Sequence, residues 1–326
     1  MVSFFKEKST AAVFGLIIIS SLARAFFWMR PPQLVIVPGD GLIYYLLSPL
    51  SAIPVLLLPL LYQAIIIVQA LRLNYAFNDV RLFPKSAFTG ALAYILLTAL
   101  LPAWNNITAA LVINTVLIWI IYKLIKLYNT QQPKTLLFNI GLITGTTVLL
   151  YVPSFPLFIV IFFALATFRP FSLNEWLILL AGIITPFYFI TGWLFLNGNL
   201  NTTLQQLQIF ELQIIRPQNL ALIIATFSVA ATAIIAGIFL WQSNSGRMVI
   251  QVRKTWSVLF ITILCLSPVV FFTKDAWPNA LLLLGVPASA FVSNVFLYPK
   301  RNLLPALLFW VLIALIIYNN WFAIKN

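Results

Sequence analysis

Residues 11–29, AAVFGLIIISSLARAFFWM, form a nearly unbroken apolar run behind a short basic start that contains Lys6 and Lys8. A helix needs about 20 mostly apolar residues to cross a bilayer, so this run is long enough to span one. A cleaved signal peptide would have a shorter apolar run followed by small residues, whereas this run ends in bulky aromatic residues. We therefore expect residues 11–29 to be a retained membrane span.

Apolar runs of this kind recur along the whole chain. Hydrophobic residues make up 62% of the sequence and charged residues 8%, whereas a soluble domain is about 45–50% apolar and about 25% charged. So much apolar surface is stable only when lipid is the solvent. We predict an all-α fold, a polytopic transmembrane helical bundle of about eleven spans that forms one membrane domain over residues 1–326. The expected spans lie near residues 11–29, 53–71, 87–103, 107–122, 136–152, 155–168, 176–196, 220–241, 256–272, 280–297 and 303–318.

The charges predict how this bundle is threaded. With these spans in place, most of the 19 Lys and Arg residues fall on the side of the N-terminus. The loops of the other side contain only Arg30, Arg216, Lys274 and Lys325. Positively charged loops stay in the cytoplasm, so we expect the N-terminus inside and the C-terminus outside. The basic residues are scattered singly between apolar runs, so the net charge of +13 does not predict a nucleic-acid partner.

Several residues at the ends of spans are expected to have structural roles. Tryptophans at span ends, Trp104 and Trp256 among them, are expected in the aromatic belts at the membrane surface. Arg169 is expected to anchor the topology, and Asp79 and Glu175 to be solvated loop charges.

The composition excludes several kinds of chemistry. The chain has no His, which removes the commonest metal ligand and the commonest general base. Its one cysteine, Cys265, lies inside an apolar run, and the sequence has no Gly-rich phosphate loop of the Walker type. We predict no metal and no cofactor.

Asp40 is the candidate catalytic residue. It lies between Gly39 and Gly41 in the first loop of the predicted outer face, directly after Pro38, so a turn is expected there. A carboxylate near apolar surface can have a raised pKa and act as a general base, or it can bind a metal. The alternative is an ordinary Asp in a tight turn, where Asp is favoured for its local hydrogen bonds.

Arg24 lies inside the first expected span. A cation costs roughly 2.5–3.5 kcal/mol at mid-bilayer on the insertion scale, so Arg24 should face the bundle interior or a wet cavity. There it could contact a phosphate or a carboxylate. The alternative is that its side chain snorkels to the nearby outer interface.

Residues 200–216, LNTTLQQLQIFELQIIR, place apolar residues near helical spacing with polar residues on the opposite face. We expect an amphipathic helix that lies on the outer surface. It could be a lid over an outer cavity, with Glu211 and Arg216 reaching in. It could equally be a surface helix that ties two spans together.

The runs PKTLLFNIGLITG (133–145), YVPSF (151–155) and ALATFRPFSLNEW (164–176) resemble an uncharacterised family of bacterial inner-membrane proteins, defined as a domain of unknown function. The resemblance covers most of the chain and implies a multi-pass protein of the bacterial inner membrane. Members are sometimes labelled carotene-cleaving monooxygenases. Such oxygenases hold iron with several His, so a chain without His is not expected to be one.

A looser resemblance is to the C-type glycosyltransferases, multi-span enzymes that use polyprenyl-phosphate sugars. The features that carry it are the inner N-terminus, Asp40 in the first outer loop, a hairpin with Gly141 and Gly145, and the polar insertion 197–219. The resemblance implies that Asp40 is the base that activates an acceptor hydroxyl. It implies that Arg24, Arg30 or Arg216 holds the lipid phosphate. The first outer loop departs from the pattern because it has one acidic residue and not a pair.

Two other classes of function stay open. One is a non-catalytic membrane subunit of an envelope assembly or export complex, for which a solid bundle is expected. The other is a transporter of a lipid or a small solute, for which a cavity at mid-membrane between pseudo-symmetric halves is expected. A transporter driven by protons or sodium usually has an ionisable residue in the middle of a span, and the expected spans after the first one have none.

Overall fold

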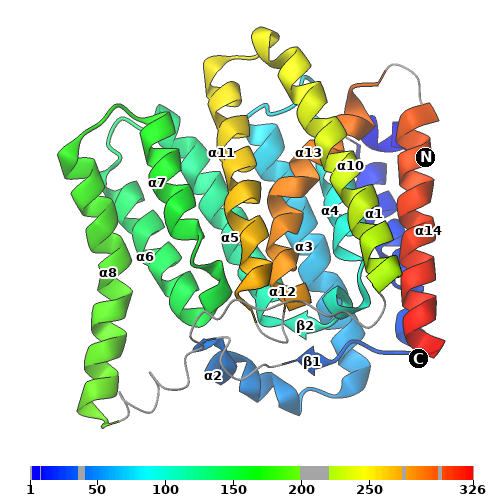
Figure 1. Ribbon diagram of the computed structural model, residues 1–326, viewed down its shortest axis with the longest axis horizontal. Helices are drawn as coiled ribbons and strands as arrows, with labels where there is room; N and C mark the ends of the chain where they lie inside the picture. The colour runs from blue at the N-terminus through cyan, green and yellow to red at the C-terminus, as the bar shows by residue number, and fades with distance from the viewer. Residues whose placement is uncertain are drawn as a thin grey trace.

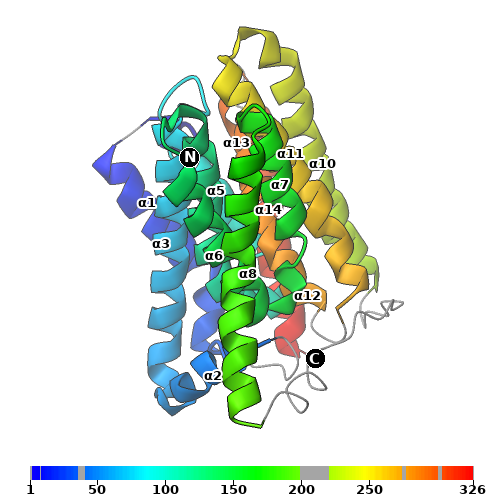
Figure 2. The same cartoon turned by 90° about the vertical axis from the view of Figure 1, so that its left-hand side faces the viewer.

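The computed structural model describes residues 2–7, 9–35, 41–198, 220–273, 277–299 and 303–325. These residues form a bundle of helices, and successive long helices run in opposite directions along its vertical axis (Figures 1 and 2). The long helices are α1 (Thr10–Ala23), α3 (Leu58–Asp79), α4 (Thr89–Thr98), α5 (Ala109–Lys126), α6 (Lys134–Leu150), α7 (Leu157–Phe168), α8 (Leu173–Leu196), α10 (Leu220–Asn244), α11 (Ile250–Leu266), α13 (Gly285–Leu297) and α14 (Leu303–Lys325).

The two ends of the bundle differ in their connections. The N-terminus lies toward the top of Figure 1 and the C-terminus toward the bottom, so we call these the upper and lower ends. At the lower end lie the short helices α2 (Ile43–Leu47) and α12 (Trp277–Leu281). Strands β1 (Leu34–Val35) and β2 (Ile107–Thr108) pair there in parallel, with Leu34 opposite Ile107. This pair joins the segment after α1 to the start of α5.

Length and composition indicate a multi-pass membrane protein. Within the described residues, 7 helices are long and apolar enough to cross a membrane. They are Val55–Asp79, Ala109–Asn129, Leu173–Leu196, Ala221–Arg247, Ile250–Phe271, Trp277–Leu297 and Leu303–Trp321. The bundle also has shorter apolar helices, α1, α4 and α6 among them. Large apolar side chains stay exposed on the outer helices, as expected where lipid surrounds the protein.

Helix α3 has bounds that differ from the expected span 53–71, because it begins at Leu58 and ends at Asp79. Pro59 lies in its first turn, where the missing N–H of proline costs no hydrogen bond. Leu73 and Phe77 are one helical turn apart and are both fully buried. Burial of these two side chains stabilises the helix beyond residue 71, through polar residues that we expected to lie in a loop.

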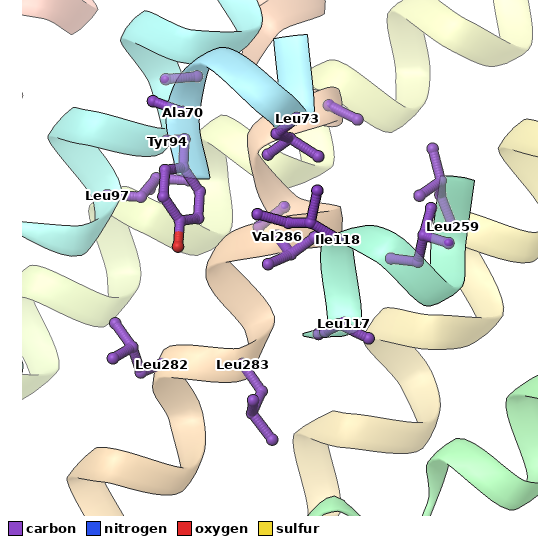
Figure 3. Packing of buried hydrophobic residues seen from close by; sticks show 14 of the residues in the cluster. Ala70, Leu73, Tyr94, Leu97, Leu117, Ile118, Leu259, Leu282, Leu283 and Val286 are labelled. Carbon is purple, nitrogen blue, oxygen red and sulfur yellow. The ribbon is translucent and has the colours of Figure 1, made fainter. Parts of the chain in front are cut away.

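Helix α4 is the centre of the hydrophobic core. Each of its ten residues is buried. Figure 3 shows Tyr94 and Leu97 of α4 beside Ala70 of α3, with Leu282 and neighbouring residues below them. The labelled residues in this view come from α3, α4, α5, α11, the turn before α13 and the start of α13. A helix buried on all sides can be short, because it does not need to match the thickness of the lipid.

Two of the tryptophans expected in an aromatic belt lie in the protein core. Trp256 is fully buried, and its ring stacks on Trp241 with centroids 6.0 Å apart. Trp104 is 8% exposed, and its Nε1 donates a hydrogen bond to the carbonyl oxygen of Pro278. The prediction was wrong for both residues, because long-range packing decides between a core site and a membrane surface.

Glu175 is not a solvated loop charge. Arg169, which follows α7, donates to its carboxylate from Nη2 at 2.8 Å and from Nε at 3.3 Å. Arg169 also donates to the carbonyl oxygen of Thr130 at 2.9 Å. This bidentate ion pair joins the two ends of the turn between α7 and α8.

Helices α6 and α8 touch through glycines. A Cβ atom on Gly141 of α6 would overlap the carbonyl oxygen of Leu179, and one on Gly182 of α8 would overlap that of Phe138. A Cβ on Gly145 would lie 2.6 Å from the carbonyl oxygen of Ile183. Small residues spaced in this way let two membrane helices approach closely. This contact holds α8 at the left edge of the bundle in Figure 1.

We expect Gly182→Leu to destabilise the protein, because the new side chain would force α6 and α8 apart. Overpacking of a well-packed site typically costs about 1–3 kcal/mol. Gly192→Leu in the same helix is the matched control, since a Cβ at Gly192 meets nothing within 4 Å. Thermal unfolding in detergent should show a lower melting temperature for Gly182→Leu alone. Equal melting temperatures for the two variants would contradict the close contact.

Candidate functional site

Asp40, Glu211 and Arg216 lie outside the described residues, as does the predicted surface helix 200–216. Arg24 and Arg30 are described, and both follow α1 at the lower end of the bundle. The candidate site is therefore built from these two arginines and the groups around them.

Arg24 is buried inside the bundle, with 2% of its surface exposed. Its Nη1 donates to Oγ of Ser20 at 3.0 Å, and its Nη2 donates to Oγ1 of Thr98 at 3.1 Å. Nη2 also lies 3.5 Å from the carbonyl oxygen of Ile95. The guanidinium carbon is 5.3 Å from the centre of the Tyr62 ring, a cation–π distance. Arg24 thus does not snorkel to the surface, and its role as a lipid-phosphate contact stays a prediction.

The carboxyl end of α4 explains why an arginine lies there. The helix ends at Thr98 within the core, and the backbone N–H groups of Ala99 and Leu100 donate to its carbonyl oxygens at Leu96 and Leu97. The chain then continues through residues 99–101, which are not helical and so leave their own carbonyls without the donors of a helical turn. Buried side chains donate to one carbonyl of the last turn of α4 and to the three carbonyls of the segment after it. The pairs are Arg24 with Ile95, Asn320 with Ala99, Asn319 with Leu100 and Asn105 with Leu101. A cation at this end also offsets the negative pole of the helix dipole. We call these four side chains the α4 cap.

A cavity of about 240 Å³ lies beside the α4 cap at the lower end. The rings of Phe26 and Phe27 and several prolines form its apolar wall. Its polar groups come from Arg30, Gln33, Asn105, Asn106 and Asn320. Arg30 is exposed at this cavity, whereas Arg24 is not among the lining residues. The structure therefore does not bring the two arginines together in one pocket.

The asparagines of the cavity are held in place by hydrogen bonds to the backbone and to each other. Oδ1 of Asn106 accepts from the backbone N–H of Gln33 at 3.0 Å, beside the strand pair. Nδ2 of Asn105 donates to Oδ1 of Asn320 at 3.1 Å. Oδ1 of Asn105 is buried and has no hydrogen-bond partner among the described residues. A buried acceptor without a donor is costly, so a ligand that donates a hydrogen bond would stabilise it.

Sequence reasoning missed the asparagines, although a signal was present. Asn105 and Asn106 follow Trp104, and Asn319 and Asn320 precede Trp321. Paired amides at the ends of two apolar runs indicate a shared polar site only if the two runs are known to be neighbours. The spacing of these residues along the chain does not show that the two runs are neighbours.

The described residues contain no group of three or more His, Cys, Asp or Glu side chains that could hold a metal ion. The chemistry available at the cavity is hydrogen bonding by amides and attraction by one guanidinium.

We expect Asn319→Leu to destabilise the protein by about 1–3 kcal/mol, the usual cost of leaving a buried carbonyl without its donor. Nδ2 of Asn319 donates to the carbonyl oxygen of Leu100 at 2.7 Å and to Oγ1 of Thr226 at 3.0 Å. Asn197→Leu is the control, because Asn197 also donates to a helix carbonyl but is exposed. Thermal unfolding in detergent measures the difference. A melting temperature of Asn319→Leu equal to that of the control would rule out the α4 cap as a stabilising contact.

The sequence matches no protein-family model, and comparisons with curated proteins and with solved structures give no match. The candidate site therefore rests on its geometry and chemistry alone.

Proposed function

We propose that the protein is a C-type glycosyltransferase of the bacterial inner membrane, which transfers a sugar from a polyprenyl phosphate at its lower end. In this proposal the shorter apolar helices cross the membrane together with the seven long ones, and the N-terminus is cytoplasmic. The basic residues support this orientation. Lys85, Lys134, Arg169 and Arg247 belong to turns or helix ends at the upper end, as the positive-inside rule requires.

The observation that carries the proposal is the cavity beside the α4 cap. Amides both donate and accept hydrogen bonds, so they suit the hydroxyls of a sugar. The guanidinium of Arg30 suits a phosphate, which it can bind through two parallel hydrogen bonds. The cavity of about 240 Å³ is smaller than the roughly 300–1,000 Å³ of pockets for drug-sized ligands, so it fits one small polar group.

The proposed reaction assigns the proton and the leaving group. The acceptor hydroxyl gives its proton to the carboxylate of Asp40, which is a general base in this scheme. The acceptor oxygen then forms a bond to the anomeric carbon of the sugar, and the bond between that carbon and the phosphate oxygen breaks. The polyprenyl phosphate leaves with an added negative charge, which Arg30 stabilises.

A non-catalytic membrane subunit is the second candidate. The fully buried helix α4 and its packed surroundings support it, because a solid centre is what a scaffold requires. The two candidates differ in what they predict for single substitutions at the lower end.

We expect Asp40→Asn to lower sugar transfer by about 10²–10⁴-fold, the usual contribution of a general base, and Arg30→Gln to lower it as well. Transfer is measured with the purified protein and a labelled polyprenyl-phosphate sugar, and in cells from the envelope glycolipid profile. Arg81→Gln at the upper end is the control for lost positive charge. An Asp40→Asn profile equal to that of wild type, in a host where deletion changes it, would favour the subunit.

The orientation of the protein in the membrane is tested separately. In a Cys265→Ser background, we expect a membrane-impermeant thiol reagent to label Asn197→Cys from outside the inner membrane. Gln131→Cys, in the turn between α5 and α6, should be labelled only after the membrane is opened. Labelling of Gln131→Cys in closed cells would place the upper end outside and remove the proposed orientation.

A further inference from the structure

A groove of about 570 Å³ lies between the upper halves of α3 and α5, far along the bundle from the cavity of the proposed transferase site. Figure 2 shows α3 along the left side of the bundle. Val68, Ile118 and Trp119 form an apolar part of the groove wall. Arg72 and Lys123 add a cation from each helix, and the proposed function uses neither of them.

The cations of the groove are not neutralised by the protein. Arg72 is exposed, and among the described residues no side chain forms a hydrogen bond or an ion pair with it. Lys123 lies 5.3 Å from the centre of the Trp119 ring. Asp79, near the top of the groove, forms an ion pair with Lys126 at 3.4 Å. The groove therefore keeps a positive charge that favours an anionic ligand.

The position of Arg72 along α3 is within reach of a lipid phosphate. It precedes the end of α3 at Asp79 by two turns of helix, roughly 10 Å along the helix axis. The polar region on each side of a bilayer is roughly 5–7 Å thick. If Asp79 marks the outer edge of this polar region, the Cα of Arg72 lies about 3–5 Å inside the hydrocarbon, and the long side chain of Arg72 extends up to the level of the head groups.

The groove is fixed by buried hydrogen bonds. Nε2 of Gln69 on α3 donates to the carbonyl oxygen of Leu111 at 2.6 Å and to Oγ1 of Thr115 at 2.8 Å, both on α5. Its Oε1 accepts from the hydroxyl of Tyr94 at 2.7 Å. These bonds set the distance between α3 and α5, so the groove is present before a ligand arrives.

We propose that this groove binds one anionic phospholipid. The phosphate lies between Arg72 and Lys123, and one acyl chain lies along Val68, Ile118 and Trp119. Free phosphate would use the cations alone, whereas a lipid also covers Val68, which is 52% exposed. If the upper end is cytoplasmic, the lipid comes from the leaflet with the more negative surface.

The proposal is tested by native mass spectrometry of the full-length protein in detergent. The protein is titrated with phosphatidylglycerol or with phosphatidylcholine of the same chain length. Wild type is expected to retain phosphatidylglycerol preferentially. One cation near a membrane surface contributes about fivefold in affinity, so Arg72→Gln with Lys123→Gln is expected to weaken that binding by roughly 25-fold. Arg247→Gln with Arg253→Gln removes the same charge elsewhere and should leave binding unchanged.

A second pair of variants separates shape from charge. Val68→Trp fills the groove without a change of charge and should also weaken binding of phosphatidylglycerol. Leu60→Trp, on the same helix but outside the groove, should have no effect, since Leu60 is 68% exposed. If the protein with Arg72→Gln and Lys123→Gln does not fold, the comparison of Val68→Trp with Leu60→Trp tests the proposal in its place.

Three results would overturn the proposal. The first is that Val68→Trp retains as much phosphatidylglycerol as wild type. The second is that Arg247→Gln with Arg253→Gln loses as much binding as Arg72→Gln with Lys123→Gln, and the third is that millimolar inorganic phosphate displaces the lipid.

Discussion

The chain leaves α4 inside an apolar bundle, and the carbonyls of residues 99–101 just beyond the helix are the constraint on which the rest of the structure depends. An unsatisfied backbone group in such surroundings costs several kcal/mol, so each carbonyl needs a donor. The donors come from Arg24 directly after α1, from the turn after α4 and from α14. The break in α4 therefore determines which helices must be neighbours at the lower end.

This constraint also explains the location of the candidate site. The α4 cap gathers amides at one end of the bundle, and the cavity with Arg30 lies directly against two of them, Asn105 and Asn320. Because those amides already donate to backbone carbonyls, they are rigid, and rigid polar groups bind a small ligand at little cost in conformational entropy. Asn105 and Asn320 thus stabilise the fold through their bonds to carbonyls and also line the cavity where a ligand would bind.

The sequence predicted the helices well and the polar contacts poorly. Apolar runs locate most helices because lipid-facing helices need a minimum apolar length. The upper end of α3 was missed because burial of Leu73 and Phe77 outweighs the polar residues between them. Trp256 was assigned to a belt because sequence alone does not show that Trp241 and Phe291 surround it. Asn105 and Asn320 were missed because their contact joins residues 215 positions apart.

The α4 cap has a consequence for how the chain assembles as it is synthesised. Asn319 and Asn320 belong to α14, and they bond carbonyls 219 and 221 positions earlier in the sequence. The ribosome delivers α4 to the membrane well before α14 exists. Until then Ala99 and Leu100 must find water or a temporary protein donor. A chain that lacks α14 therefore has two carbonyls in the bundle interior without the donors that the folded protein gives them.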